Sequence, residues 1–320
     1  MNEVQLIDKY LKRLTKKNNS SQGLNDDIFF DKSKKLAVSI DTYVEKVHFP
    51  NFKAPDLVIK KILRSSLSDL ICKGVKPKYY FISASGNSKS FSNKNLKKIS
   101  NSLSLEQRRF DIELSGGDTV YSNTNSFTCC VVGYSNKIVK RHKSIIGDDI
   151  YITGHLGDSF IGLQILKKKI SVPKSLKKYF ISKFYMPSIS LKMINFLQKF
   201  ANTSIDISDG LLIDLKKMTR QQKYGFSIRL DDIELSNQLK KVLSKNKRFK
   251  IENTIFNGDD YEIIFTSHKK NRSLINKYAK NKKLKIQRIG IILKKHHESC
   301  ILKGNKKFRI NKNPGYTHQF

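Results

Sequence analysis

The sequence has no long apolar run and few cysteines, and each shortage excludes a class of protein. No segment is long and apolar enough to cross a bilayer as a helix. Residues 1–17 lack the apolar centre and small-residue cleavage site of a signal peptide, so we expect a cytoplasmic protein. The 320 residues, 38% of them hydrophobic, suffice for two folded domains with buried cores and argue against disorder.

The spacing of the cysteines and the absence of known phosphate-binding and zinc-binding motifs exclude further classes of protein. The four cysteines include no C-x-x-C pair, and Cys129 and Cys130 are adjacent in an expected strand, where they point to opposite faces. Buried, reduced thiols are the simplest interpretation. The chain has no G-x-x-x-x-G-K-[ST] loop, no H-R-D kinase motif and no H-E-x-x-H zinc motif. P-loop enzymes, protein kinases and zinc hydrolases of these types are therefore excluded.

Acidic residues are scarce, with 27 Asp plus Glu against 62 Lys plus Arg and a net charge of +35. Such an excess of positive charge could indicate nucleic-acid binding. The basic residues are spread over many segments, however, and residues encoded by AT-rich codons are abundant throughout, which favours a drift in composition. Nucleic acid is therefore an unlikely partner, although the charge could attract anionic substrates.

Hydrophobic periodicity and turn residues predict an α+β fold. Strands are expected at 36–41, 79–84, 127–134, 150–153, 226–230, 262–266 and 285–292. Helices are expected at 55–73, 91–109, 158–168, 176–184, 191–200, 208–218 and 272–279. Residues 1–17 read as an amphipathic helix with an apolar side. The polar stretch 136–147 is the expected boundary between a domain of residues 1–140 and a domain of residues 141–320.

The carboxylates of this lysine-rich chain gather in short segments beside small residues, several of them where a strand ends or a helix begins. The segments, which we expect to be mostly turns, are 23–27, 39–42, 66–69, 116–119, 206–210 and 258–262. Each one alone is equally compatible with ordinary turns and helix caps. Together they indicate a cluster that binds divalent cations and a polyphosphate, because Mg²⁺ prefers hard oxygen ligands. Positioning and charge neutralisation supply most of the catalysis in phosphoryl transfer.

The order of the motifs resembles one enzyme family along the whole chain. The most specific segments are SIDTYVEKVHF at 39–49, SLSDLICKG at 66–74, SGGDT at 115–119, TGHLGDSFIGL at 153–163, SIDISDGLLIDL at 204–215, NGDDYEIIFT at 257–266 and the aromatic tail GYTHQF at 315–320. They resemble thiamine-monophosphate kinases, which belong to the superfamily of aminoimidazole ribonucleotide synthetase and selenophosphate synthetase. The resemblance implies transfer of phosphate from ATP to thiamine monophosphate, directly and in line, with no covalent nucleophile.

The resemblance also implies roles for individual residues. The implied ligands of several Mg²⁺ ions are Asp27, Ser39, Ile40 through its backbone, Asp41, Asp69, Asp118, Asp206 and Asp209. The implied ATP contacts are Gly117, Asp118, Arg141 and Ser208, and a guanidinium suits phosphate oxygens. The implied contacts of the thiamine end are His48, Asp259 and Tyr316. A cationic thiazolium ring favours an aromatic face and a nearby carboxylate.

The resemblance further implies a homodimer in which the N-terminal sheets of two subunits pair into a barrel. The N-terminal domain would bind ATP and Mg²⁺ and dimerise, and the C-terminal domain would close the cleft. The chain departs from the family pattern at Asn25, Ser66, Ile189, Ser190, Asn257 and Asp259. These departures affect the expected affinity and rate more than the reaction class.

Two alternatives remain open from the sequence. The first is another ATP-dependent enzyme of the superfamily, acting on a purine intermediate or on selenide. No cysteine precedes Cys72, whereas selenophosphate synthetases are expected to carry a reactive one near the N-terminus. The second is a basic nucleic-acid-binding protein on an inactive fold. It predicts binding that weakens steeply with salt and does not depend on the acidic residues.

Overall fold

The computed structural model describes residues 1–246, 248–308, 315–316 and 318, and its strands form two sheets that use different parts of the chain. The first sheet contains β1 (Phe29–Asp31), β2 (Leu36–Val44), β3 (Lys76–Gly86), β4 (Glu113–Tyr121) and β5 (Ser126–Tyr134). The second sheet contains β6 (Asp149–Thr153), β7 (Thr203–Asp206), β8 (Tyr224–Arg229), β9 (Ile263–Ser267), β10 (Ile286–Lys295), β11 (Cys300–Lys303) and β12 (Lys306–Lys307). The helices are α1 (Glu3–Leu6), α2 (Pro55–Cys72), α3 (Asn93–Phe110), α4 (Asp158–Leu166), α5 (Lys174–Tyr185), α6 (Lys192–Phe200), α7 (Leu211–Arg220), α8 (Asn237–Lys245), α9 (Ile251–Ile255) and α10 (Arg272–Lys282).

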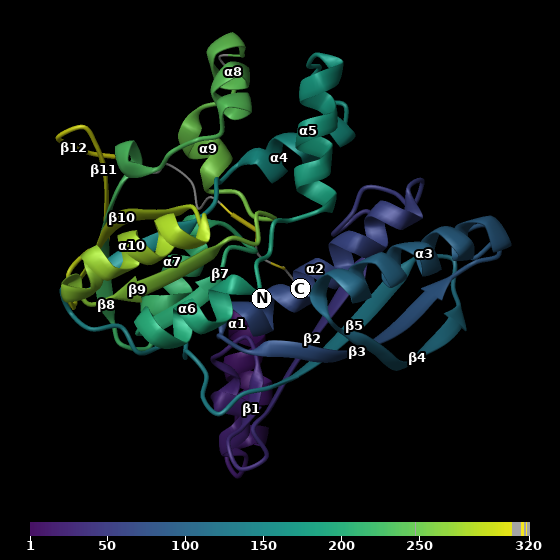
Figure 1. Cartoon of the computed structure of the whole chain (residues 1–320), viewed down its shortest axis with the longest axis horizontal. Helices are drawn as coiled ribbons and strands as arrows, with labels where there is room; N and C mark the ends of the chain where they lie inside the picture. Colours follow the sequence, from purple (N-terminus) through teal and green to yellow (C-terminus); the bar gives the residue numbers. More distant parts are fainter. Residues whose placement is uncertain (247, 309–314, 317, 319–320) are drawn as a thin grey trace.

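The first sheet has the order β1-β2-β5-β3-β4, and helices cover one of its faces. α2 packs on β2, β5 and β3, and α3 lies beside α2 on the same side (Figure 1). β4 pairs only with β3, in parallel, and forms an edge whose nine residues are all exposed. Apolar side chains elsewhere in this sheet are also exposed, among them Ile40 at 67% and Phe81 at 37%.

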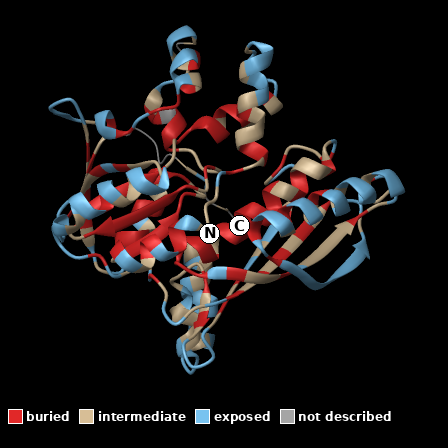
Figure 2. Cartoon of the chain, in the orientation of Figure 1, coloured by how far each residue is buried: buried red, intermediate tan, exposed pale blue. Residues whose placement is uncertain are grey.

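The second sheet is covered on both faces, which follows from alternation along its strands. Ile264 and Phe265 are neighbours on β9, and both are fully buried, but in different clusters. Ile264 faces the cluster that α7 closes. Phe265 packs its ring 5.3 Å from Phe196 of α6, which in turn lies 5.3 Å from Tyr278 of α10. Figure 2 shows the resulting buried centre of this half of the molecule.

The buried core continues from one sheet to the other. The cluster around α2 includes Tyr151 of β6, Phe184 of α5 and Phe265 of β9 as well as the apolar residues of the first sheet. α2 is therefore buried along almost all of its length, as Figure 2 shows. Its limits agree with the sequence prediction, because Pro55 begins it and Gly74, with φ +74°, follows its end. We find no helix among the described residues that could cross a membrane.

Most predicted elements are present, but the sequence did not predict helices α8 and α9 or strands β1, β7, β11 and β12. Of the acidic segments expected to be mostly turns, 39–42 lies in β2 and 66–69 lies in α2. The segment 116–119, expected as a turn, lies inside strand β4. Gly116 and Gly117, with φ +148° and +158°, permit this backbone close to Phe81 and Ile82 of β3. The expected amphipathic helix at 1–17 is divided into α1, a π-helix at Ile7–Leu11 and a 3₁₀ turn at Lys12–Thr15. Its apolar side is not buried, since Leu14 is 73% exposed.

Candidate active site

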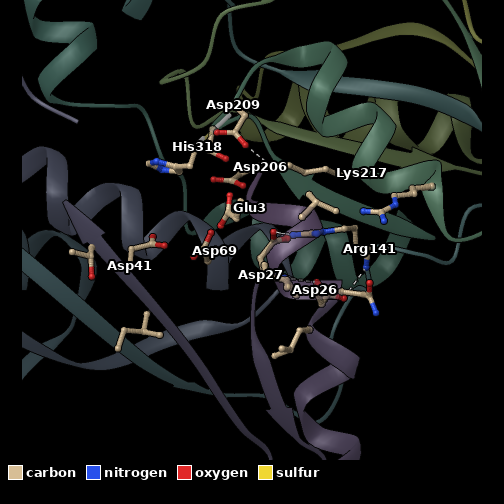
Figure 3. A pocket seen from close by; sticks show the side chains of 18 of the residues that line it. Glu3, Asp26, Asp27, Asp41, Asp69, Arg141, Asp206, Asp209, Lys217 and His318 are labelled. Carbon is tan, nitrogen blue, oxygen red and sulfur yellow. Dashed lines mark hydrogen bonds and ion pairs between the residues drawn. The ribbon is translucent and has the colours of Figure 1, made fainter. Parts of the chain in front are cut away.

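A pocket of about 490 Å³ lies between the two sheets, and acidic residues from five separate segments line it (Figure 3). β2 contributes Asp41, α2 contributes Asp69, and the loop after β7 contributes Asp209, with Asp206 at the end of that strand. Asp26 and Asp27 follow a 3₁₀ segment at Asn19–Leu24, and Glu3 comes from α1. Ile40, His48, Arg141 and Ser208 also line the pocket.

Three of these carboxylates lie beside hydroxyl groups; Asp206 is buried, and Asp41 and Asp69 are half-buried. The Tyr43 hydroxyl donates to Asp41 at 3.0 Å, the Ser39 hydroxyl donates to Asp69, and the Ser68 hydroxyl donates to Asp206 at 2.9 Å. In the described part of the chain, none of the three acids has a Lys or Arg within ion-pair distance. Hydroxyl groups are therefore the groups that stabilise their charged forms at close range.

The pKa values of these acids are raised because the groups are shielded from solvent and lie close to other carboxylates. Burial and the charge of Asp214 raise the pKa of Asp206 to about 7. Burial and the neighbouring carboxylates of Asp41 and Asp206 raise the pKa of Asp69 well above its ordinary value. Burial also raises the pKa of Asp41. An arrangement of this kind favours binding of cations, since an added positive charge removes the repulsion.

Asp26 and Asp27, at the same pocket, are already paired with basic residues. Lys73 Nζ lies 2.8 Å from Asp26 and 2.6 Å from Asp27, and the Arg141 guanidinium forms a second ion pair with Asp27. Burial works against the charged form of Asp26, but ion pairing with Lys73 and Arg141 lowers its pKa.

A similar pairing holds the start of α7. Lys217 Nζ lies 2.5 Å from Asp209 and 3.0 Å from the buried Asp214. Asp214 also accepts the N–H groups of Asp209 and Gly210, at 3.1 and 3.0 Å, and thereby fixes the loop that precedes this helix.

The oxygen-rich set fits Mg²⁺ by donor type but does not form a finished metal site. Among the described residues, no three His, Cys, Asp or Glu side chains converge on one point where an ion could sit. Arg141 Nε is buried and has no hydrogen-bond partner in the described structure. A phosphate oxygen would suit this donor.

The residues expected at the thiamine end lie close to one another, through contacts that the sequence did not predict. His48 accepts the Val44 N–H at 2.9 Å, and its ring lies 5.5 Å from that of His318. The His318 ring lies 4.9 Å from Tyr316, whose N–H donates to the Asp209 carbonyl at 3.0 Å. Thr317, Gln319 and Phe320 of the expected aromatic tail lie outside the described residues.

Asp259 lies beside this group, and it is not a free carboxylate. Lys61 Nζ lies 2.5 Å from Asp259 and 4.0 Å from the centre of the Phe184 ring. Lys61 is 1% exposed, so the pair is buried on the lysine side. Sequence reasoning missed Lys61, Lys73 and Lys217, because lysine is usually a surface residue and this chain is rich in it.

Gly117 and Asp118 are the two predicted site residues that lie away from the pocket. In the sheet register, Asp41 pairs with Cys129, Cys129 with Ile82, and Ile82 with Gly117. Three strand spacings therefore separate Gly117 from Asp41, about 14 Å. Both residues line a different, mostly apolar pocket of about 440 Å³ between α3 and β4.

Comparison with known proteins gives the family. Residues 25–135 match the model of the AIR synthase related protein, N-terminal domain. The thiamine-monophosphate kinase of Buchnera aphidicola subsp. Schizaphis graminum is 35% identical over 330 aligned positions, which cover 99% of this chain and 98% of that protein. The chain belongs to the thiamine-monophosphate kinase family.

Solved structures of this family have the same fold. AaThiL complexed with AMPPCP and TMP aligns with a TM-score of 0.85 and 26% identity, covering 99% of this chain and 97% of that one. The crystal structure of thiamine-monophosphate kinase from Aquifex aeolicus aligns with a TM-score of 0.79 and 27% identity, covering 96% and 99%. The α+β fold with two sheets is therefore that of the aminoimidazole ribonucleotide synthetase type, as the sequence predicted.

Proposed function

We propose that this protein is a thiamine-monophosphate kinase that converts ATP and thiamine monophosphate into ADP and thiamine diphosphate. The observation that supports this most directly is the pocket that collects Asp27, Asp41, Asp69, Asp206 and Asp209 from distant segments of the chain. Family membership along the full length supports the choice of substrate. A curated relative and this chain cover each other almost completely, so no large part of the relative is missing here.

The reaction needs charge neutralisation and alignment more than it needs a reactive side chain. The acceptor is a phosphate oxygen, which is already a nucleophile, and in-line transfer requires no covalent intermediate on the protein. Asp41, Asp69 and Asp206 would hold Mg²⁺, with Ser39, Ile40, Asp27 and Asp209 contributing at the edge of the cluster. When bound, Mg²⁺ would neutralise the phosphate charges of both substrates. Arg141 and Ser208 would contact the phosphates of ATP.

At the thiamine end, His48 and Tyr316 would present aromatic faces to the cationic ring of the substrate. Burial and the positive charges nearby lower the pKa of His48, so its ring stays neutral near pH 7 and does not repel that cation. The carboxylate of Asp259 would face the ring while Lys61 holds it in place. Lys61 thus becomes a positioning residue for the thiamine site.

A homodimer would account for Gly117 and Asp118, which lie away from the acidic pocket of their own chain. One face of the first sheet carries no helix and exposes Ile40 and Phe81, and β4 is an unpaired edge. Pairing these surfaces of two subunits into a barrel would bury them. We propose that Gly117 and Asp118 act on ATP and Mg²⁺ within such a dimer, where the partner's β4 can approach the pocket. Residues 1–140 would then be the ATP-binding and dimerisation domain, and residues 141–320 would close the cleft.

The decisive experiment is a coupled assay of ADP release with purified protein, ATP, Mg²⁺ and thiamine monophosphate. We expect turnover that depends on all three. Unphosphorylated thiamine, a purine intermediate and selenide are the controls, because they separate this activity from those of the other superfamily members. Turnover with the purine intermediate or selenide, but not with thiamine monophosphate, would show that the protein has the activity of another superfamily member. No turnover with any of them would refute the proposal.

A further inference from the structure

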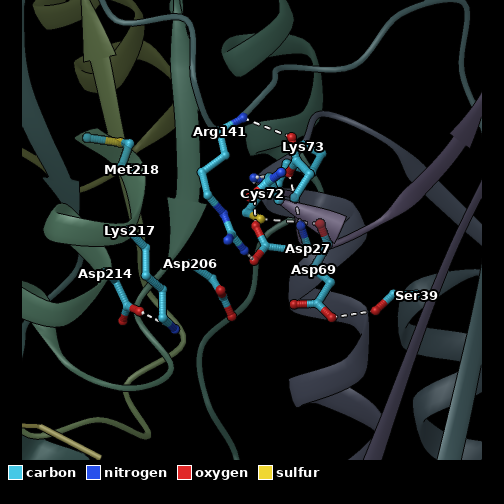
Figure 4. Close-up of polar contacts among 12 residues, drawn as sticks. Asp27, Ser39, Asp69, Cys72, Lys73, Arg141, Asp206, Asp214, Lys217 and Met218 are labelled. Carbon is cyan, nitrogen blue, oxygen red and sulfur yellow. Dashed lines mark hydrogen bonds and ion pairs between the residues drawn. The ribbon is translucent and has the colours of Figure 1, made fainter. Parts of the chain in front are cut away.

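Lys73 has an unusual environment for a lysine. It follows the last residue of α2, is fully buried, and makes three close polar contacts (Figure 4). Its Nζ lies 2.8 Å from Asp26 Oδ1 and 2.6 Å from Asp27 Oδ2, and it donates to the Ser204 carbonyl at 2.6 Å. The contact with Ser204 is a hydrogen bond, and the two carboxylates are ion-paired with the ammonium group at close range. The contacts join α2, the segment before β1 and strand β7.

Arg141 completes a neutral group around the same two carboxylates. Its guanidinium pairs with Asp27, and its backbone N–H donates to Asp26 Oδ2 at 3.0 Å. The Asp26 and Asp27 side chains are 4% and 12% exposed, and those of Lys73 and Arg141 are 0% and 15% exposed. Two negative and two positive charges thus balance within one largely buried group. Such burial is tolerated only when charges are paired and hydrogen-bonded in this manner.

The acidic residues of the pocket therefore fall into two groups with different charge. Asp26 and Asp27 are balanced by Lys73 and Arg141. Asp41, Asp69 and Asp206 have hydroxyl partners, and no Lys or Arg of the described residues forms an ion pair with them. Lys73 follows the end of α2, four residues after Asp69, so the end of the helix places the ammonium group at the border between the two groups.

We propose that Lys73 is a resident counter-ion of this site. Its ammonium group takes the position beside Asp26 and Asp27 that a cation from solution would otherwise have to fill. The Asp26–Asp27 segment then keeps its conformation without metal, so Asp27 is already in place at the edge of the cluster when divalent ions bind at Asp41, Asp69 and Asp206. Only the identity of the divalent ion rests on the proposed function. The charge balance itself does not.

The test compares Lys73→Met with the unmodified protein in EDTA and in saturating Mg²⁺, by thermal unfolding. Methionine keeps an unbranched stem of similar length and removes the charge. We expect a loss in Tm of roughly 6–10 °C in EDTA, because breaking a buried ion pair leaves carboxylates uncompensated. Mg²⁺ should restore more than half of that loss. The Mg²⁺ concentration at the midpoint of the thermal shift should fall about tenfold, because the site has gained one negative charge.

A matched control is Lys76→Met. Lys76 lies just after the same helix and pairs with Asp111 at 2.7 Å, but both side chains are more than half exposed. We expect a change in Tm of about 1 °C or less, the same with and without Mg²⁺. A purely structural role for Lys73 predicts an equal loss of Tm in EDTA and in Mg²⁺, and that result would overturn the proposal, as would no loss at all.

A second variant keeps the proposal testable if Lys73→Met does not fold. The double variant Asp26→Asn/Lys73→Met removes one charge of each sign and restores the balance of the group. We expect it to fold and to recover most of the Tm lost in Lys73→Met. Failure to recover would contradict the counter-ion role. None of these measurements uses thiamine monophosphate, so a negative kinase assay would refute the proposed function and leave this inference standing.

Discussion

Replacing Asp206 with asparagine should stabilise the metal-free protein at neutral pH while it abolishes most of the activity. Asp206 is 2% exposed, and its pKa is raised to about 7 from the ordinary 3.8. Burial contributes most, followed by the charge of Asp214, and Asp41 adds to it, whereas Ser68 and Lys217 oppose it. Asparagine has nearly the same shape and still offers an oxygen to the Ser68 hydroxyl.

The magnitude follows from the difference in pKa between the folded and unfolded states. The folded protein holds the proton of Asp206 more tightly than the unfolded chain does. Stability is therefore greatest at low pH and falls as pH rises from about 4 to about 7. The shift of about 3 units corresponds to a loss of about 4 kcal/mol at high pH. Asparagine cannot ionise, so Asp206→Asn should not suffer this loss.

The assay is urea unfolding in EDTA at about pH 5 and about pH 8, with the linear extrapolation to water. Part of this loss has already occurred by pH 5, which is above the unfolded pKa, so Asp206→Asn should lose about 2.5 kcal/mol less than the unmodified protein between the two pH values. Adding Mg²⁺ at the higher pH should stabilise the unmodified protein more than the variant. Asp111→Asn is the control, because Asp111 is exposed and its ion pair with Lys76 lowers its pKa. Identical pH profiles of stability for the unmodified protein and Asp206→Asn would refute the reasoning.

Two further substitutions test the proposed roles of Asp118 and Asp259. Asp118→Asn should lower kcat by roughly 10²–10³ without changing Tm, as loss of one preorganised charge contact does; near-normal turnover in the coupled assay would remove Asp118 from the metal site. Asp259→Ala should raise the KM for thiamine monophosphate at least about tenfold more than the KM for ATP, because the cationic ring of thiamine no longer faces the Asp259 carboxylate. Equal changes in the two KM values would place Asp259 outside the substrate site.

The sequence predicted most of the longer helices and buried strands, because local signals there agree with the tertiary structure, but it missed α8, α9 and the buried strand β7. α2 has proline at its start, glycine after its end and apolar residues between them, and each signal is physical rather than statistical. β4 was missed as a strand because S-G-G-D-T has little side-chain preference for a sheet. What makes it a strand is its pairing with β3, a contact that is distant along the chain.

The acids of the site could be predicted from their order along the chain, but their charge partners could not. Asp41, Asp69 and Asp206 occur in recognisable motifs. Lys61 and Lys73 lie on a helix where every face is buried, so periodicity gives no sign that they differ from exposed lysines. Only the folded arrangement shows that each ammonium group meets a carboxylate.

Helix α2 also sets how the two ends of the site move. Lys61, at the thiamine end, and Lys73, at the Asp26–Asp27 end, are twelve residues apart, which is about 18 Å along a helix. Asp69 lies between them on the same continuous, buried rod. If the substrates bind as proposed, a tilt of this rod would displace the acceptor and donor sites together. Adjustment of the cleft would then come from the loops around it.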